Sequence, residues 1–179
     1  MNVANAALLV IDMQRTLFEK STPIYRADDL LDTILGLVDR AHEAGAPVVY
    51  IQHSSKMMER GTDAWRLHPR LQPADGDLLV EKTHGDAFED TDLADVLTAR
   101  SVATLIVTGL VTHGCVRATC LGGTSRGYDM ILVADGHSNY NRKAARLVEE
   151  WNETLGSRIT AVIPASDVHF GGAGAGRPS

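Results

Sequence analysis

Residue types that can carry out nucleophilic chemistry occur at three places in this sequence. Cys115 lies in the stretch Leu105-Ile-Val-Thr-Gly-Leu-Val-Thr-His-Gly-Cys-Val116, where an apolar run ends in a glycine-containing turn and a helix should begin. Unpaired N–H groups and the helix dipole favour a thiolate there and can bind an oxyanion. Asp12 and Lys82 each follow another apolar run. Together the three side chains supply a nucleophile, a base and a cation.

The elements that must position these residues alternate along the chain. Short apolar runs typical of buried parallel strands occur at Ala7 to Ile11, Pro47 to Ile51, Leu78 to Val80, Ala103 to Val107, Met130 to Ala134 and Ile159 to Ile163. Helical spacing of apolar residues occurs at Asp28 to Ala44, Leu93 to Ala99, His113 to Arg126 and Asn141 to Leu155. This order predicts a three-layer, Rossmann-like α/β/α domain with a six-stranded, mostly parallel sheet.

Ligands of an open parallel sheet bind beyond the carboxyl ends of its strands. Asp12, Lys82 and Cys115 follow the first, third and fourth predicted strands, so we expect them to meet at one edge. There Asp12 would take the thiol proton and return it to a leaving amine, while Lys82 would stabilise the thiolate. N–H groups around Val111 and Cys115 would receive the oxyanion.

The composition favours one domain with small-molecule chemistry. The chain has 179 residues, of which 44% are hydrophobic, and we expect a single domain over residues 1–170 with a flexible, glycine-rich tail at 171–179. A net charge of −6 without a Lys/Arg run argues against nucleic acid or an anionic membrane as partner. No apolar run approaches the roughly 20 residues that span a bilayer. Cys115 and Cys120, five positions apart on one predicted helix, cannot form a disulfide, which fits a reducing cytoplasm.

Four stretches occur in this order along the chain: Leu8-Leu-Val-Ile-Asp-Met-Gln14, Gly76-Asp-Leu-Leu-Val-Glu-Lys82, Gly109-Leu-Val-Thr-His-Gly-Cys-Val116 and Gly127-Tyr-Asp-Met-Ile-Leu-Val-Ala-Asp-Gly-His-Ser138. With these stretches the sequence resembles the isochorismatase-like cysteine hydrolases, in their metal-free amidohydrolase branch. The resemblance implies that Asp12, Lys82 and Cys115 form a catalytic triad.

The resemblance implies further features of the site and the assembly. A non-proline cis peptide, which turns N–H groups toward the oxyanion, would fall on Val111-Thr112. The pocket would be lined by Gln14, Phe18, Trp65 and Phe88. Since relatives commonly form dimers or tetramers whose neighbouring chains help close the pocket, we expect a homo-oligomer of one of these kinds.

We expect no catalytic metal and no other cofactor. Metal-dependent nicotinamidases carry Asp-x-His after the second strand and another His shortly afterwards, whereas this chain has Gln52-His53-Ser54-Ser55-Lys56, which offers too few ligands for a zinc-type site. Because nicotinamidases hold the pyridine ring through such a metal, nicotinamide is a poor candidate substrate. A G-x-G-x-x-G motif after the first strand and a Walker lysine are also missing, so the fold does not imply a nucleotide.

Several other residues have two interpretations. His53 and Trp65, in the long connection from His53 to Gly76, either line the pocket or pack in a lid. His113 either contacts substrate or caps its turn. Asp86, where many relatives carry Ser, is either a solvated loop residue or a carboxylate that favours a cationic substrate. Cys120 should serve only in packing.

The sequence thus predicts a cysteine hydrolase that cleaves the C–N bond of a small, non-peptide amide through a thioester. True isochorismatases cleave a vinyl ether and lack the catalytic cysteine, so the presence of Cys115 favours an amide-type bond. Two alternatives stay open. One is a vinyl-ether (isochorismate-like) hydrolase that works through Asp12 without the thiol, and the other is a non-catalytic relative that binds a metabolite.

Overall fold

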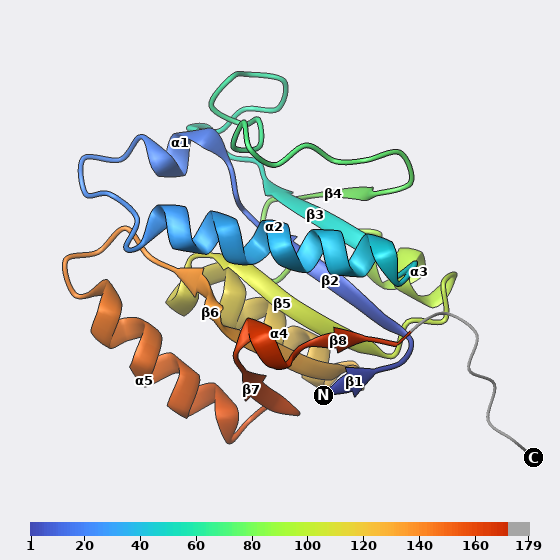
Figure 1. Cartoon of the computed structure of the whole chain (residues 1–179). Helices are drawn as coiled ribbons and strands as arrows, with labels where there is room; N and C mark the ends of the chain where they lie inside the picture. Colours follow the sequence, from blue (N-terminus) through green and yellow to red (C-terminus); the bar gives the residue numbers. More distant parts are fainter. Residues whose placement is uncertain (172–179) are drawn as a thin grey trace, which may run out of the picture.

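The computed structural model of this protein describes residues 1–171, so the predicted flexible tail lies, apart from its first residue, outside the described residues. Six parallel strands form the central sheet in the order β4-β3-β2-β5-β6-β7 (Figure 1). Their bounds are β2 (Ala6–Ile11), β3 (Val48–His53), β4 (Leu78–Lys82), β5 (Thr104–Leu110), β6 (Asp129–Ser138) and β7 (Ala161–Ile163). The predicted three-layer fold is confirmed, with each strand overlapping its predicted run.

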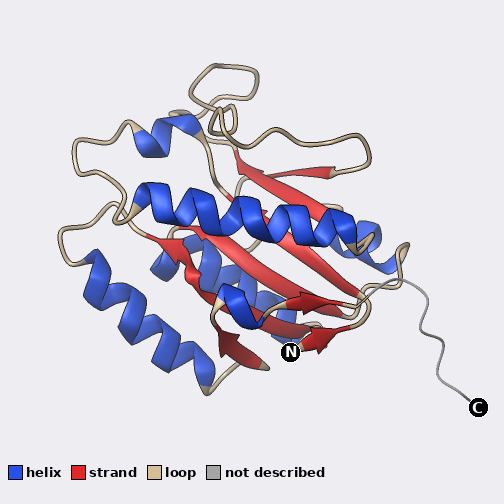
Figure 2. Cartoon of the chain, in the orientation of Figure 1, coloured by secondary structure: helices blue, strands red, loops and turns tan. Residues whose placement is uncertain are grey.

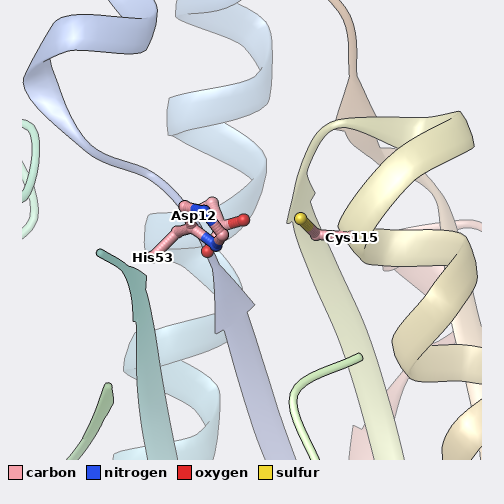
Figure 3. A group of neighbouring side chains, drawn as sticks. All are labelled: Asp12, His53 and Cys115. Atoms are coloured by element: carbon pink, nitrogen blue, oxygen red, sulfur yellow. The ribbon is translucent and has the colours of Figure 1, made fainter. Parts of the chain in front are cut away.

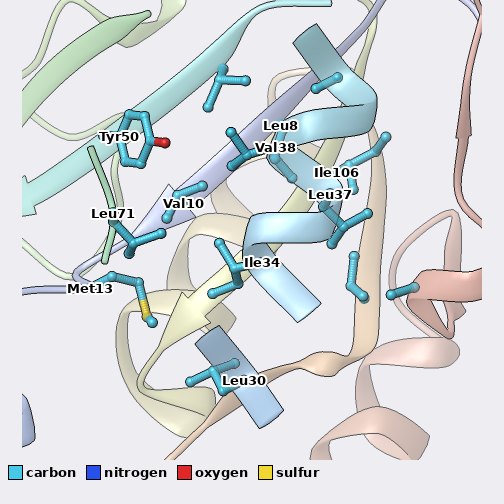
Figure 4. Close-up of a cluster of buried hydrophobic side chains, with 14 of the residues drawn as sticks. Leu8, Val10, Met13, Leu30, Ile34, Leu37, Val38, Tyr50, Leu71 and Ile106 are labelled. Atoms are coloured by element: carbon cyan, nitrogen blue, oxygen red, sulfur yellow. The ribbon is translucent and has the colours of Figure 1, made fainter. Parts of the chain in front are cut away.

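Helices cover both faces of this sheet (Figure 2). They are α1 (Arg15–Phe18), α2 (Ala27–Glu43), α3 (Leu93–Thr98), α4 (Arg117–Ser125) and α5 (Ala144–Gly156). The apolar side of α2 packs on one face of β2 and β3, where Leu30, Ile34 and Leu37 meet Leu8 and Val10 (Figure 4). The opposite face holds a second core, to which α3, α4 and the inner side of α5 contribute Leu93, Leu97, Cys120 and Leu155. No helix within residues 1–171 has the length and apolar character needed to cross a bilayer.

Three local features differ from the sequence prediction. A two-stranded parallel sheet pairs β1 (Asn2–Val3) with β8 (His169–Phe170), and runs of two residues are too short to predict from periodicity. The helix expected from His113 begins as a π-helical turn, η1 (Thr112–Val116), before α4, because Gly114 has a non-helical backbone conformation. A short 3₁₀ turn, η2 (Ala165–Asp167), precedes β8.

A glycine sets the approach of β5 to β2 next to the site. Gly109 lies opposite Ile11 in the parallel register and has φ +114°, which disfavours any other residue. A Cβ atom on Gly109 would lie 2.1 Å from the carbonyl oxygen of Ile11. The ends of the two strands that precede Asp12 and Cys115 can therefore come together only because residue 109 has no side chain.

Candidate active site

The predicted catalytic side chains lie together at the carboxyl edge of the sheet. Asp12 follows β2, Lys82 is the last residue of β4, and Cys115 lies in η1. Figure 3 shows the side chains of Asp12 and Cys115 on neighbouring elements, together with that of His53 at the end of β3. The Nζ of Lys82 is 2.9 Å from Oδ2 of Asp12 and 3.2 Å from Sγ of Cys115. Lys82 is 1% exposed and Asp12 3%, so this ion pair is buried beside the sulfur.

Asp12 has one carboxylate oxygen free for chemistry. Its Oδ2 accepts from Lys82, whereas its buried Oδ1 has no hydrogen-bond partner among the described residues. The backbone of Asp12 is left-handed, with φ 51°, a conformation that Asp tolerates better than most residues and that recurs at functional sites. An unpaired buried carboxylate oxygen is a ready proton acceptor.

The environment of Cys115 favours the thiol over the thiolate. Burial, followed by the negative charge of Asp12, raises the pKa of Cys115 to about 11, and the nearby Lys82 opposes this only in part. This result is contrary to the low pKa that we expected from a position in the first turn of a helix. Proximity to a cation alone does not produce a thiolate when that cation is already paired with a carboxylate.

His53 lies in the same cluster. Its Nδ1 is 3.2 Å from Nζ of Lys82, and the carbonyl oxygen of His84 is 3.1 Å from the same ammonium. Burial and the charge of Lys82 lower the pKa of His53, so the imidazole is neutral at pH 7 and its Nδ1 accepts from Lys82. The structure thus places His53 beside the predicted triad.

The donor set at this edge is poorly suited to a metal ion. Ligand atoms of Asp12, His53 and Cys115 all lie within 4.8 Å of one another, a spacing that a metal ion could use. However, the ammonium of Lys82 lies within 3.2 Å of an atom of each of these residues. A bound cation would meet that charge and compete for the same lone pairs, so these residues fit an ammonium better than a metal.

The turn before Cys115 is closed by the carbonyl of Val111, which accepts from the N–H groups of Gly114 at 3.0 Å and Val116 at 3.4 Å. The non-proline cis peptide joins Leu110 to Val111 and not Val111 to Thr112 as expected. The cis bond therefore lies one peptide bond earlier in the chain than expected, directly after Leu110, the last residue of β5.

The polar groups of the Gln14 and Trp65 side chains form hydrogen bonds within the protein. The Nε2 of Gln14 donates to the carbonyl oxygens of His53 at 3.0 Å and Trp65 at 2.8 Å, and its Oε1 accepts from the His53 N–H at 2.8 Å. The indole of Trp65 donates to Oγ of Ser54 at 2.9 Å. The ring of Phe18 packs on the imidazole of His68, with centroids 4.5 Å apart. These contacts fix the long connection over the ends of β2 and β3.

Phe88 lies elsewhere. It is buried in the second core, stacked on Tyr128 with ring centroids 5.5 Å apart and covered by the guanidinium of Arg126. These contacts hold the Phe88 ring in the core beside α4, and its place in the pocket stays a prediction. Asp86 pairs with Arg126 at 3.1 Å and accepts from the Phe88 N–H, so its carboxylate is already used within the protein.

Two polar residues at the end of β6 were missed by the sequence analysis. Asn139 is 1% exposed, and its Oδ1 contacts Nδ1 of the predicted pocket residue His113 at 2.9 Å. His137 is also buried and contacts Thr112. Both were missed because β6 runs to Ser138, whereas the apolar run in the sequence ends at Ala134, so they do not directly follow the predicted strand.

Comparison with known proteins agrees with this geometry. Residues 6–151 match the Isochorismatase domain. Streptothricin hydrolase of Streptomyces noursei is 33% identical over 188 residues, covering 97% of this chain and 73% of that protein. N-carbamoylsarcosine amidase of an Arthrobacter species is 28% identical over 158 residues, covering 74% of this chain and 53% of that enzyme. A crystal structure of an isochorismatase family protein superposes with a TM-score of 0.85 at 28% identity, covering 89% of this chain and 98% of the other. The relatives similar to this chain include hydrolases, and among these is an amidase. The chain therefore belongs to the isochorismatase family.

Proposed function

We propose that this protein is a cysteine amidohydrolase that cleaves the C–N bond of a small, non-peptide amide without a metal ion. The observation that carries the proposal is the buried contact of one ammonium, that of Lys82, with both Asp12 and Cys115, at 2.9 and 3.2 Å. Similarity to a streptothricin hydrolase and an N-carbamoylsarcosine amidase supports the choice of hydrolysis and of an amide-type bond.

The first half-reaction forms a thioester. With a pKa of about 11, Cys115 is protonated at pH 7, so Oδ1 of Asp12 takes the thiol proton as Sγ attacks the carbonyl carbon. Lys82 stabilises the negative charge on the sulfur, and N–H groups of the turn from Val111 to Cys115 receive the oxyanion. When the tetrahedral intermediate collapses, the C–N bond breaks and Asp12 gives the proton to the leaving nitrogen.

The second half-reaction hydrolyses the thioester, and Asp12 again acts first as base and then as acid. A water molecule gives a proton to the Asp12 carboxylate and attacks the thioester carbon, so a C–O bond forms and a second oxyanion develops in the same turn. Breaking the C–S bond releases the carboxylic acid, and the Cys115 sulfur recovers its proton from Asp12. Lys82 supports both steps electrostatically through its contacts with Asp12 and Cys115.

Substrate selection is proposed to reside in the connection that follows β3. Gln14 and Gln52 both donate to the carbonyl oxygen of Trp65, at 2.8 and 2.9 Å, which holds this connection beside His53.

The proposed assembly is a dimer or tetramer. Exposed apolar side chains, among them Met57 at 74% and Leu79 at 60%, are consistent with a neighbouring chain that covers them. Two unpaired cysteines fit a cytoplasmic location.

The proposal is tested with a panel of amides that includes streptothricin, N-carbamoylsarcosine and simple ureido acids, followed by mass spectrometry of products and of the intact protein. On any amide that is hydrolysed, Cys115→Ala should lower kcat/KM by at least about 10³-fold. Cys120→Ala is the matched control, because that thiol is fully buried in the second core. Full activity of Cys115→Ala would contradict the mechanism and favour a hydrolase that needs no thiol.

A further inference from the structure

A chain of hydrogen bonds, half-buried at α5 and buried at its inner end, links α5 to the turn that carries Cys115. The carboxamide nitrogen of Asn152, on α5, donates to the carbonyl oxygen of Ala134 at 3.1 Å. Its Oδ1 lies 2.8 Å from Nε2 of His137. The other ring nitrogen of His137, Nδ1, lies 2.8 Å from Oγ1 of Thr112, the first residue of η1. The chain therefore runs from the outer helix to the residue that follows Val111.

The chemistry of these partners fixes the direction of every bond. A carbonyl oxygen can only accept, so Asn152 presents its NH₂ to Ala134 and its oxygen to His137. That oxygen also only accepts, so Nε2 of His137 carries a hydrogen. Burial of the ring, which is 3% exposed, lowers the pKa of His137 to about 4, so the imidazole is neutral at pH 7 and its Nδ1 is an acceptor. The hydroxyl of Thr112 must then donate to His137.

This bond decides between two orientations of the Thr112 hydroxyl. The same oxygen is 3.1 Å from the carbonyl oxygen of Ser138, but a hydroxyl has one proton, and the contact with Nδ1 of His137 is shorter at 2.8 Å. Thr112 is itself fully buried. Its side chain is therefore held against β6 by an imidazole with a single tautomer.

The position of Thr112 gives this bond a consequence for catalysis. Thr112 lies between Val111, whose carbonyl closes the turn, and the residues that lead to Cys115. Oxyanion stabilisation requires N–H groups that are fixed before the reaction, and small displacements are costly. Building on the proposed function, we propose that His137 is a positioning residue, which acts through the hydroxyl of Thr112 to hold the oxyanion-binding turn in place.

The test compares two reactions of the same thiol. Iodoacetamide alkylates Cys115 by direct displacement of iodide and needs no oxyanion site, whereas p-nitrophenyl acetate acylates it through a tetrahedral oxyanion and releases p-nitrophenol. Rates are measured for both reagents, with modification assigned to Cys115 by mass spectrometry. The readout is the ratio of the acylation rate constant to the alkylation rate constant, which a general loss of thiol reactivity does not lower, and it is compared only between variants that urea unfolding shows to be folded.

We expect Thr112→Val to lower acylation 10- to 100-fold while alkylation changes less than 3-fold, and Thr112→Ser to restore the ratio. Asn152→Ala, at the outer end of the chain, should lower the same ratio by a smaller factor with little risk to the fold. Combining Asn152→Ala with Thr112→Val should add nothing to the loss, because both act through one bond.

Equal losses in both reactions, or an unchanged ratio in Thr112→Val and Asn152→Ala, would overturn the role of His137 while leaving the proposed hydrolase intact. A Cys115 that neither reagent modifies in the unsubstituted protein would overturn both proposals together.

Discussion

The Nζ of Lys82 lies 3.2 Å from the Sγ of Cys115, yet the pKa of this thiol is raised to about 11. Burial is the first cause, and the charge of Asp12, which shares the same ammonium, is the second. An Asp–Lys pair is nearly neutral at a distance, so the sulfur gains little net stabilisation of its anionic form. The two partners of the pair must therefore shift the reactivity of Cys115 in opposite directions.

We predict that Asp12→Asn accelerates iodoacetamide alkylation of Cys115 at pH 8 and abolishes amide hydrolysis. Without the Asp12 charge the pKa of Cys115 falls, and each unit of that fall raises the thiolate fraction about tenfold. Lys82→Met should have the opposite effect on alkylation, because it removes the group that lowers this pKa. The measurement is the pH–rate profile of alkylation at Cys115, with the buried Cys120 as internal reference. Slower alkylation in Asp12→Asn would mean that Asp12 acts as a base in that reaction too.

The resting protonation state of Cys115 was the point at which the sequence misled us. Its pattern correctly indicated a strand, a glycine-containing turn and a helix start, but it contained neither the distance to Asp12 nor the depth of burial. Proton transfer to Asp12, which the sequence analysis already assigned, is therefore needed for the attack, because Cys115 starts as a thiol.

Gly109 gives a prediction about the fold that supports the site. Gly109→Ala would place a Cβ 2.1 Å from the backbone oxygen of Ile11 at a φ of +114°, so we expect a loss of more than about 3 kcal/mol in the free energy of unfolding, or insoluble protein. Gly36→Ala, in the middle of α2 with no atom within 4 Å of the new Cβ, should instead stabilise the protein by about 0.5–1 kcal/mol. Urea unfolding compares the two. Equal effects would show that the close approach of β5 to β2 is not required.

Gln14 gives a prediction about the long connection. Gln14→Leu keeps most of the volume but removes three hydrogen bonds, with His53 and Trp65, that hold this connection to β2 and β3. We expect trypsin to cleave after Lys56 or Arg60 about tenfold faster or more, since each lost bond contributes about 1 kcal/mol against local opening. Gln72→Leu is the control and should be cleaved at the original rate, because within residues 1–171 the exposed amide of Gln72 hydrogen-bonds only the Pro69 carbonyl.

The strands were predictable because buried parallel strands appear in the sequence as apolar runs. The residues that follow them were predictable because ligands of such a sheet bind beyond the carboxyl ends of its strands. That reasoning placed Asp12, Lys82 and Cys115 together correctly. Phe88 was assigned to the pocket by the family resemblance and not by this reasoning, and the direction of its ring depends on how α4 packs, which the sequence does not show. The same reasoning gave no structural role to Gln14, because a buried glutamine is recognised only when its three backbone partners are known.

His137 makes the stability of the protein depend on pH in a defined range. Its pKa is lowered from 6.5 to about 4 by burial, which the contacts with Asn152 and the charge of Asp135 only partly oppose. Between these two values the unfolded chain binds a proton that the folded protein does not, so stability is lost as pH falls from 6.5 to 4. The loss from this residue amounts to about 2–3 kcal/mol by pH 4.5.

We therefore predict that the difference in the free energy of unfolding between pH 7.0 and pH 4.5 is smaller by about 2–3 kcal/mol in His137→Gln than in the unsubstituted protein. Urea unfolding at the two pH values gives this difference directly. His53 and His68 also have lowered pKa values, but they titrate in both proteins and cancel in the comparison. The same pH dependence in both proteins would mean that the folded protein takes up this proton as readily as the unfolded chain does. At the pH values where His137 is then protonated, the hydroxyl of Thr112 would accept from the imidazole and donate to Ser138, which reverses the hydrogen bond on which the role of His137 rests.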